Sequence, residues 1–332
     1  MANLGIMNDG AFSVTALTAT INEIESVPSQ LTKMGIFEEQ GITTTTFQIE
    51  KEADTLSLVP SSVRGASGMV VQGNKRQLIP FATLHLPERA TITADEVLGV
   101  RAFGKTTEMQ TIQGVIRQRL VKMKQQIDAT MEWQKIGAIK GSIKDADGVT
   151  ELLNIYTAFG VEKPDDISFG LTSANTELRG KCLTLLDTID DNLKGARFSG
   201  VNVLCGRDFW EALITHAKVK ETYLQTQAAA ALRGNPNEAL DFGGVHFERY
   251  RGKVAGKSFI DANEAFAIPT GVAGMFISRF APADYMETVN TIGYPYYAKQ
   301  ELMPFGKGVM LECQSNPIHL CTRPRAVIRL TK

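Results

Sequence analysis

The chain lacks the two hydrophobic signals that direct a protein into or across a membrane. Its 332 residues contain no run of about eighteen apolar residues, the length that a membrane-spanning helix needs. The first ten residues lack the basic and apolar blocks of a secretory signal, so we expect the chain to fold inside the cell. No charge of one sign dominates, because 35 Lys and Arg residues stand against 36 Asp and Glu residues, with a formal net charge of -1. The overall charge therefore gives no preference for nucleic acid or for an anionic membrane.

Cysteine is also scarce, and its spacing disfavours both disulfides and metal binding. The four cysteines, Cys182, Cys205, Cys313 and Cys321, are far apart and form no C-x-x-C pair, a pattern that favours reduced, buried thiols. His319 lies two residues from Cys321, on the same face of a predicted strand, with Cys313 nearby in the sequence. These three residues lack the paired spacing of structural zinc sites, so core packing is the favoured interpretation. We predict no metal and no cofactor.

Two further patterns resemble enzyme sites but lack an essential part. Residues 252–258, Gly-Lys-Val-Ala-Gly-Lys-Ser, have three residues between their glycines where a phosphate-binding loop has four, and a strand pattern follows instead of a helix. A hairpin turn fits this segment better. Cys182 or Cys205 with His216 could form the nucleophile and base of a cytosolic hydrolase, yet no local sequence creates an activated thiolate. The hydrolase is kept as an alternative from a different functional class.

The acidic clusters fit solvated surfaces and turns better than catalysis. The aspartate pairs at residues 165–166 and 190–191 consist of adjacent side chains, which point in different directions, so we expect them to be solvated. Residues 145–148 resemble the start of a calcium-binding loop, but Asn154 stands where that loop requires a bidentate glutamate. A turn is the favoured interpretation of residues 145–148.

The chain does contain one long amphipathic helix pattern. It extends from about Thr106 to Lys135, which predicts a helix of about thirty residues and roughly 45 Å. Its apolar stripe consists of Met109, Ile112, Ile116, Leu120, Met123, Ile127 and Met131. Four basic side chains gather in the middle of the helix, at Arg117, Arg119, Lys122 and Lys124. A solvated helix face accounts for these four better than contact with nucleic acid.

Extended segments precede this helix. Residues 1–36 show weak periodicity and are predicted to form an arm more than part of a core. Thr43 to Phe81 have a strand pattern on both sides of a turn-rich centre, which predicts one long hairpin with its tip near Arg64 to Gly68. Strands of about fifteen residues would extend roughly 50 Å, far more than an isolated hairpin can support. Both segments are therefore expected to need another surface.

The second half of the chain has the pattern of a compact α+β domain. A hairpin is predicted from Ala138–Ile143 and Val149–Ile155. Residues 166–284 then alternate helices with strands, and residues 285–332 return to strands. The expected elements are a capped helix after Ser173, a strand at Val201–Cys205, a helix from Arg207 to about Ala217, and strands at Val245–Arg249, Ser258–Ile260, Gly308–Gln314 and Ala326–Leu330.

These elements together describe an assembly subunit, because the distinctive features concern reach and contact and no pattern completes an active site. The sequence resembles the major capsid protein E family of lambda-like tailed bacteriophages over nearly its whole length. The order of the shared strings carries the resemblance: Ile36-Phe37 with the Thr-rich strand to Glu50, Leu58-Val59-Pro60, Arg64-Gly65, Leu86-Pro87, residues 92–96, 219–221, 247–251, 281–284, 293–299 and 314–317, and Arg323-Pro324.

The resemblance implies an α+β chain with the Hong Kong 97 phage capsid fold. The parts it implies are an N-terminal arm at 1–36, an extended β-hairpin loop at 37–84, a peripheral domain with a long spine helix at 85–165 plus about 285–320, and an axial domain at 166–284 plus about 321–332. It also implies contacts between copies at Phe37, Arg64, Gly65, Met69, Glu88 and Arg89.

The function that the resemblance implies is structural and not enzymatic. Copies would form homo-hexamers and pentamers that tile an icosahedral head shell around non-specifically held double-stranded DNA. The chain would start in the host cytoplasm and end in the virion capsid, with a scaffold, a portal and a decoration protein as further partners and no membrane. Family members pass from a procapsid to an expanded shell, and Gly114 inside the long helix is a hypothetical bending point. A non-viral encapsulin-like compartment is an alternative, because its shell contacts would be alike.

Overall fold

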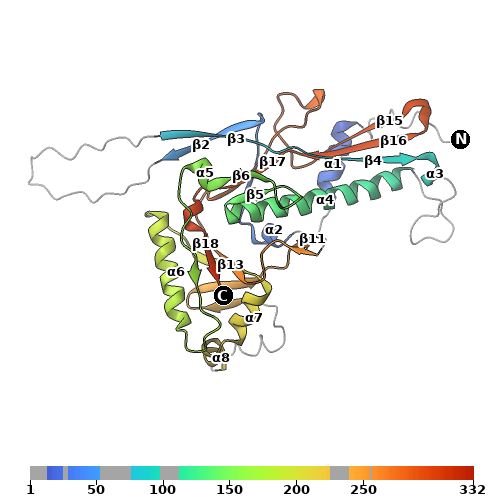
Figure 1. The fold of residues 1–332 in the computed structure, drawn as a ribbon. Helices are drawn as coiled ribbons and strands as arrows, with labels where there is room; N and C mark the ends of the chain where they lie inside the picture. Colours follow the sequence, from blue (N-terminus) through green and yellow to red (C-terminus); the bar gives the residue numbers. More distant parts are fainter. Residues whose placement is uncertain (1–12, 25–28, 53–75, 98–111, 225–238, 255) are drawn as a thin grey trace, which may run out of the picture. The chain divides into compact units, whose positions relative to one another are not determined.

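Two compact units make up the chain in the computed structural model (Figure 1). The structure describes residues 13–24, 29–52, 76–97, 112–224, 239–254 and 256–332. Unit 1 comprises residues 1–47, 81–133 and 277–319, and unit 2 comprises residues 48–80, 134–276 and 320–332. Each unit therefore draws on three separate stretches of sequence, and the chain passes from one unit to the other five times.

The long amphipathic helix is α4 (Ile112–Lys140), and the boundary between the two units falls within it, after Trp133. The apolar stripe is confirmed where side chains are described, since Ile116, Leu120, Met123, Ile127 and Met131 are each at most 6% exposed. The helix continues five residues beyond the predicted end at Lys135. Its predicted start at Thr106, with Met109, lies outside the described residues.

A three-stranded antiparallel sheet packs on this stripe in unit 1. Its order is β15 (Tyr297–Leu302), β16 (Gly308–Ser315) and β4 (Leu86–Thr93). Because successive side chains of a strand point to opposite faces, Ile92, Val309 and Leu311 turn to one face and join Leu120 and Met123 in a single core. The opposite face of the sheet is left with polar side chains such as Arg89, Glu312 and Lys299.

The helix α1 (Val14–Glu23) belongs to the same core. Ser13 begins it as the N-cap, and its hydroxyl accepts a hydrogen bond of 3.2 Å from the backbone nitrogen of Ala16. Leu17 and Ile21, one helical turn apart, are 4% and 0% exposed. The weak periodicity of residues 1–36 did not predict this buried helix. Two shorter helices complete the described helices of unit 1, α2 (Gln30–Met34) and α3 (Ala94–Val97).

A second three-stranded sheet has the order β1 (Glu38–Gly41), β14 (Phe276–Phe280) and β17 (Pro317–Cys321). β1 runs parallel to β14, with Gly41 opposite Phe280. The chain leaves β1 in close contact with another backbone segment, because the nitrogen of Gly293 donates to the carbonyl of Ile42 at 2.9 Å. Gly41 is required for this approach, since a Cβ at that position would lie 2.1 Å from the carbonyl oxygen of Gly293.

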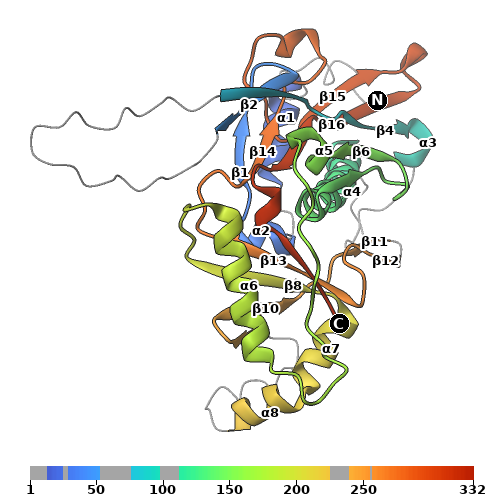
Figure 2. The same cartoon turned by 60° about the vertical axis from the view of Figure 1, so that its left-hand side comes forward.

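Unit 2 is built on a mixed six-stranded sheet (Figure 2). Its order is β7 (Ile167–Ser168), β18 (Ile328–Thr331), β13 (Glu264–Thr270), β8 (Gly200–Cys205), β10 (Val245–Arg249) and β9 (Leu240–Phe242). The described helices of unit 2 besides the end of α4 are α5 (Ile155–Phe159), α6 (Leu178–Leu193), α7 (Arg207–Thr215) and α8 (Ala217–Leu224). The turn between β9 and β10 lies against α6, because a Cβ at Gly243 would stand 2.8 Å from the Cβ of Cys182.

Short strand pairs and single turns of 3-10 helix account for most of the remaining described structure. The pairs are β2 (Thr46–Glu52) with β3 (Arg76–Ala82), β5 (Ser142–Lys144) with β6 (Glu151–Asn154), and β11 (Lys253–Val254) with β12 (Lys257–Ser258). The 3-10 turns are η3 (Met286–Thr288), η4 (Pro304–Gly306) and η5 (Pro324–Ala326).

Several predicted elements are confirmed and others are wrong at their ends. The strand Val245–Arg249 is β10, and within residues 252–258 the strands Lys253–Val254 and Lys257–Ser258 pair antiparallel, as the hairpin interpretation requires. The predicted strand Ala138–Ile143 is wrong over its first half, which is the last turn of α4. A short apolar run fits a helix and a strand equally well. Here Ala138 and Ile139 are buried in unit 2 as part of the helix. The tip predicted near Arg64 to Gly68 lies outside the described residues.

Several boundaries differ from those predicted. The helix expected after Ser173 begins only at Leu178, and its N-cap residue makes no side-chain cap bond. The strand expected at Ser258–Ile260 ends at Ser258. The strand expected from Ala326 begins at Ile328, because the proline at the start of η5 favours a 3-10 turn over residues 324–326.

Candidate assembly surfaces

The residues expected at contacts between copies lie in different settings. Arg64, Gly65 and Met69 are outside the described residues. Phe37 directly precedes β1 and is only 9% exposed, with its ring edge-on to the ring of His319 at a centroid distance of 6.0 Å. The Phe37 side chain therefore supports unit 1 from within, and a role for it between copies stays a prediction.

Glu88 and Arg89 are neighbours on β4 and so occupy opposite faces of its sheet. Glu88 turns to the same face as Ile92, toward the core. Its Oε2 atom is buried and has no hydrogen-bond partner among the described residues. Burial raises the pKa of the Glu88 carboxyl above its usual value, although the charge of Lys122 acts in the opposite direction. Glu88 is thus a partly desolvated charge beneath the sheet.

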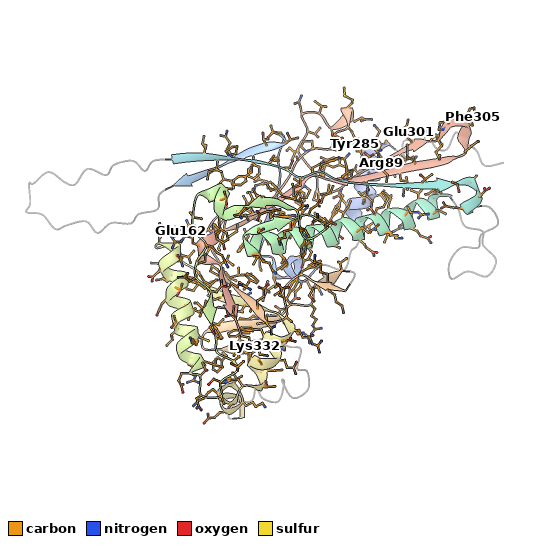
Figure 3. All side chains as sticks on the ribbon, viewed as in Figure 1. Arg89, Glu162, Tyr285, Glu301, Phe305 and Lys332 are labelled. Atoms are coloured by element: carbon orange, nitrogen blue, oxygen red, sulfur yellow. The ribbon has the colours of Figure 1, made fainter. Side chains whose placement is uncertain are left out.

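Arg89, Glu312 and Lys299 form a row across the outer face, where Glu312 stands opposite both basic residues. The Nε atom of Arg89 donates to Glu312, which raises the pKa of the guanidinium. The Nζ atom of Lys299 donates to Glu287 at 2.8 Å. Tyr285 stands beside this row and helps to line a hollow of about 240 Å³ (Figure 3). Because exposed ion pairs add little stability, this face is better suited to contact than to holding the fold.

Two segments of unit 1 expose large apolar side chains. Phe305, in the turn between β15 and β16, is 95% exposed, and Met286, in the segment between β14 and β15, is 87% exposed. No other large apolar side chain among the described residues is as exposed as these two. Val289, Ile292 and Tyr294 follow Met286 and are also more than half exposed. Single exposed apolar residues are ordinary, but four within nine residues indicate a contact surface.

Two buried charges of α4 bind the ends of the N-terminal helices. Lys124 is 4% exposed, and its Nζ atom donates to the carbonyl oxygens of Ile21 at 3.0 Å and Ile24 at 2.6 Å, where α1 ends. Glu132 is 5% exposed and accepts a hydrogen bond of 3.2 Å from the backbone nitrogen of Leu31, where α2 begins. A cation at a helix C-terminus and an anion at an N-terminus both complement the helix dipole. α4 therefore positions both helices.

The prediction of a solvated basic face is wrong for Lys124. Burial lowers the pKa of its ammonium group, which also lies 4.8 Å from the centre of the Tyr296 ring. Its position in the sequence pattern did not reveal this, because its partners are backbone carbonyls about 100 residues away. Arg117 and Lys122 are exposed as predicted, and Arg119 binds Glu96 at 2.8 Å.

The thiols proposed for the hydrolase alternative lie in an unfavourable environment for a nucleophile. Burial raises the pKa of Cys182 to about 12 and that of Cys205 well above its usual value. The thiolate is the reactive form, so both groups are held in their inert form. The Nε2 atom of His216 is hydrogen bonded to the carbonyl oxygen of Ser173 at 3.0 Å.

The other candidate chemical sites are core and turn positions. Cys313, His319 and Cys321 are buried, and no group of three or more His, Cys, Asp or Glu side chains in the described ranges could hold a metal ion. The predicted turn at residues 145–148 is confirmed. Asp147 accepts hydrogen bonds from the backbone nitrogens of Val149 at 2.8 Å and Thr150 at 2.9 Å. In the part of the chain that the structure describes, no helix has the length and apolarity to span a membrane.

Known proteins of similar sequence are phage capsid subunits. The major capsid protein of Salmonella phage Felix O1 is 26% identical, with 96% of this chain and 95% of the relative covered. The major capsid protein of Pseudomonas phage KPP10 is 27% identical, with 96% of each covered. Both alignments extend over nearly the full length of the two proteins, so the similarity includes both units.

Solved structures show the same fold at lower identity. The putative capsid protein of a prophage of E. coli CFT073 superposes with a TM-score of 0.59 at 15% identity, covering 96% of this chain and 98% of that one. The capsid of cyanophage P-SCSP1u gives 0.54 at 12% identity, covering 93% and 90%. The predicted α+β fold of the Hong Kong 97 type is therefore confirmed. A family model described as phage major capsid protein E matches residues 13–332, and the chain belongs to that family.

Proposed function

We propose that copies of this chain assemble through their own surfaces into the icosahedral head shell of a tailed bacteriophage. The family match across residues 13–332 carries the proposal. The exposed apolar side chains of unit 1 support it, because contact between copies would remove them from water. In this role the chain acts by mechanical contact, and the finished location is the virion capsid.

The proposed shell contains hexamers and pentamers in which each copy contacts the next head to tail. Such heterologous contacts form closed rings when the rotation between copies closes. The ribbon of β2 and β3 has only two strands, which are marginal alone and would gain support from a neighbouring copy. Residues 1–36 and 37–84 are the proposed arm and extended loop of this contact. Ordering of these segments would then be coupled to assembly.

The proposed partners besides further copies follow from the same role. Double-stranded DNA would fill the shell through non-specific contact, and a scaffold, a portal and a decoration protein would complete the head. The chain would fold in the host cytoplasm before it assembles. An encapsulin-like compartment would enclose an enzyme in place of genomic DNA, so the contents of shells purified from the native source separate the two proposals.

Expression of the full chain tests the central proposal. Negative-stain electron microscopy and sedimentation velocity are expected to show rings, tubes or shells whose proportion rises with protein concentration. A folded monomer or dimer that persists at every concentration, with and without a crowding agent, would contradict assembly through the chain's own surfaces.

Gly114 offers a test of shell expansion. It is the third residue of α4, and glycine costs a helix about 0.5 to 1 kcal/mol relative to alanine. If this residue is a bending point, Gly114→Ala shells should assemble but expand more slowly than the parent. Light scattering and electron microscopy follow both steps, and expansion at the parent rate would disprove the bending hypothesis.

A further inference from the structure

We infer that the tip of the β15–β16 hairpin in one copy docks on the loop before β15 in a second copy, with the Phe305 ring seated beside Met286. The tip is defined as residues 302–308, and the receiving loop as residues 284–294. This inference rests on the proposed function, because it names one contact that assembly would use.

The tip presents an aromatic ring in a conformation that phenylalanine rarely adopts. Phe305 has φ 63° and ψ 15°, in the left-handed region, while its side chain is 95% exposed. The turn is closed by backbone hydrogen bonds from Gly306 to Met303 and from Met303 to Gly308, each 3.0 Å. A strained backbone that displays an apolar ring to water lowers the stability of the isolated chain in two ways. Such an outlier points to a function for the ring outside the protomer.

The receiving loop is held in shape by its own polar groups. The hydroxyl of Thr288 donates to the carbonyl of Ala283 at 2.7 Å, and the hydroxyl of Thr291 donates to the carbonyl of Thr288 at 2.7 Å. The backbone nitrogen of Tyr294 donates to the Tyr297 hydroxyl at 2.9 Å. Because these bonds are made within the loop and to the start of β15, the four exposed apolar side chains of residues 286–294 need no rearrangement before a partner binds.

Phe305 and Met286 of one copy do not touch each other, because their side chains are 95% and 87% exposed. The receiving loop returns along β15 (Tyr297–Leu302) as far as Lys299 and Glu301, where Glu287 and Tyr285 lie, and Phe305 stands beyond them in the turn. Figure 3 shows this order, with Glu301 between Tyr285 and Phe305. The contact must therefore form between copies. Since the two surfaces differ, it is head to tail, the kind of contact that repeats around a closed ring.

The charges favour this pairing over the contact of like surfaces. Lys307 is the one charged residue of the tip, and its Nζ atom lies 5.9 Å from the centre of the Phe305 ring. Asp284 and Glu287 are the charged residues of the receiving loop, held by Gln314 at 2.7 Å and Lys299 at 2.8 Å. Two tips would bring lysines together, and two loops would bring the Asp284 carboxylates together, since Glu287 is already paired with Lys299. Opposite charges arise in the head-to-tail pairing.

The residue that precedes the tip does not reverse this argument. Glu301 is exposed and lies on β15, where it lines the hollow together with Arg89. Glu301 thus lies outside the turn that carries Phe305. The charged group beside the Phe305 ring is Lys307.

Cross-linking between engineered cysteines tests the contact directly. Phe305→Cys and Met286→Cys change exposed side chains, and the four native cysteines are buried and so protected from oxidation. We expect a mixture of the two single variants to give disulfide-linked dimers under mild oxidation, and the double variant to give a ladder of linked copies. A disulfide needs Cα atoms about 4.4 to 6.8 Å apart. Copies that dock at this contact therefore form the disulfide faster than copies that only collide at random. Disulfide-linked dimers from Phe305→Cys alone would overturn the inference. So would the absence of disulfides in normally assembled shells that contain both single variants.

Assembly yield gives a second measurement with a matched control. Phe305→Asn removes the ring while keeping a residue that accepts the left-handed conformation, and Met286→Ser removes the opposing side chain. Each should lower the yield of assembled particles about tenfold or more, as loss of a central interface residue does. Val149→Ser alters an equally exposed valine, 81% accessible in unit 2, and should leave the yield unchanged.

The two proposals fail in distinguishable ways. Particles of Phe305→Asn at a yield within about twofold of wild type would refute the docking contact and leave the head-shell proposal intact. A wild-type chain that never assembles would refute the head-shell proposal. In that case the cross-linking of concentrated single variants still decides the contact, because it requires pairs of copies and no shell. Unchanged thermal melting of the unassembled variants confirms that they fold.

Discussion

Lys124 is a buried cation whose partners are the carbonyl oxygens at the end of α1. Hydrogen bonds to a charged group contribute about 1.5 to 3 kcal/mol, and removing the ammonium group would leave these carbonyls without their donor. We therefore expect Lys124→Met to lower the free energy of unfolding by about 1 to 3 kcal/mol. Urea unfolding of the unassembled chain measures this. Arg117→Met, on the exposed side of the same helix, is the control and should stay within about 0.5 kcal/mol of wild type.

The carboxyl group of Glu88 predicts a pH dependence of the opposite sign to that of most acidic residues. Burial raises its pKa above the usual 4.5, so ionisation is less favourable in the fold than in the unfolded chain. Glu88 therefore costs stability progressively as pH rises from 4.5 through the raised pKa, and the cost is absent at lower pH. Glu88→Gln removes this titration. Its stability relative to wild type, measured in urea, should increase from acid to neutral pH.

The control for this titration is Glu162→Gln, which changes an exposed carboxylate of unit 2. As a surface substitution it should leave the free energy of unfolding within about 0.5 kcal/mol of wild type. A Glu88→Gln difference that stays constant across the pH range would show that the desolvation of Glu88 in the fold is not the source of the effect.

At the scale of elements, two helical glycines should respond in opposite directions to alanine. A Cβ at Gly137 of α4 would lie 2.9 Å from the Cα atom of Ile143 and 3.0 Å from the carbonyl oxygen of Ser142. Backbone atoms of β5 cannot turn aside as a side chain can, so Gly137→Ala should destabilise the chain by about 1 to 3 kcal/mol. Gly180 of α6 has no atom within 4 Å of the same position.

Gly180→Ala is accordingly expected to stabilise the chain by about 0.5 to 1 kcal/mol, because alanine favours the helix. Chemical denaturation compares the two variants, which both lie in unit 2. A Gly137→Ala chain as stable as the Gly180→Ala chain would show that α4 and β5 can move apart at little cost.

Elements with a strong local pattern were predictable from sequence, and those defined by distant partners were not. The stripe of α4 repeats over many turns, and the hairpin of β11 and β12 carries Gly256 at its turn, so both follow from nearby residues. In contrast, Leu17 and Ile21 of α1 can be recognised as core residues only when β15, β16 and β4 are in place. The sequence predicts a strand at the last turn of α4 because Ala138 and Ile139 fit either structure.

The contact surfaces show the same limit. The capsid family was recognisable from ordered strings along the chain, whereas the exposure of Phe305 and Met286 depends on how the backbone turns around them. Neither residue stands out in the sequence, since single apolar residues occur both in cores and on surfaces. A strained φ angle is visible only in three dimensions.

At the scale of the whole molecule, the buried cysteines can report how the two units unfold. Cys182, Cys205 and Cys321 belong to unit 2, and Cys313 belongs to unit 1. Burial raises the pKa of Cys313 and of Cys321 to about 12, so the native thiols should alkylate very slowly at pH 8. With rising urea, we expect the three thiols of unit 2 to become reactive together, since compact units open cooperatively.

Mass spectrometry of alkylated peptides measures each thiol separately. Joint exposure of Cys182, Cys205 and Cys321 would agree with one cooperative unit. Labelling of Cys182 at a urea concentration that leaves Cys321 protected would contradict it, because both residues would otherwise share a single opening step.

The alternation of the chain between the units has a consequence for its synthesis. Unit 1 cannot be completed until residues 277–319 have left the ribosome, and unit 2 still waits for β18, which pairs with both β7 and β13 inside its sheet. A nascent chain therefore lacks finished units until nearly all of it has been translated. Folding of both units is held to late in translation, so products truncated before residue 319 would carry neither unit complete.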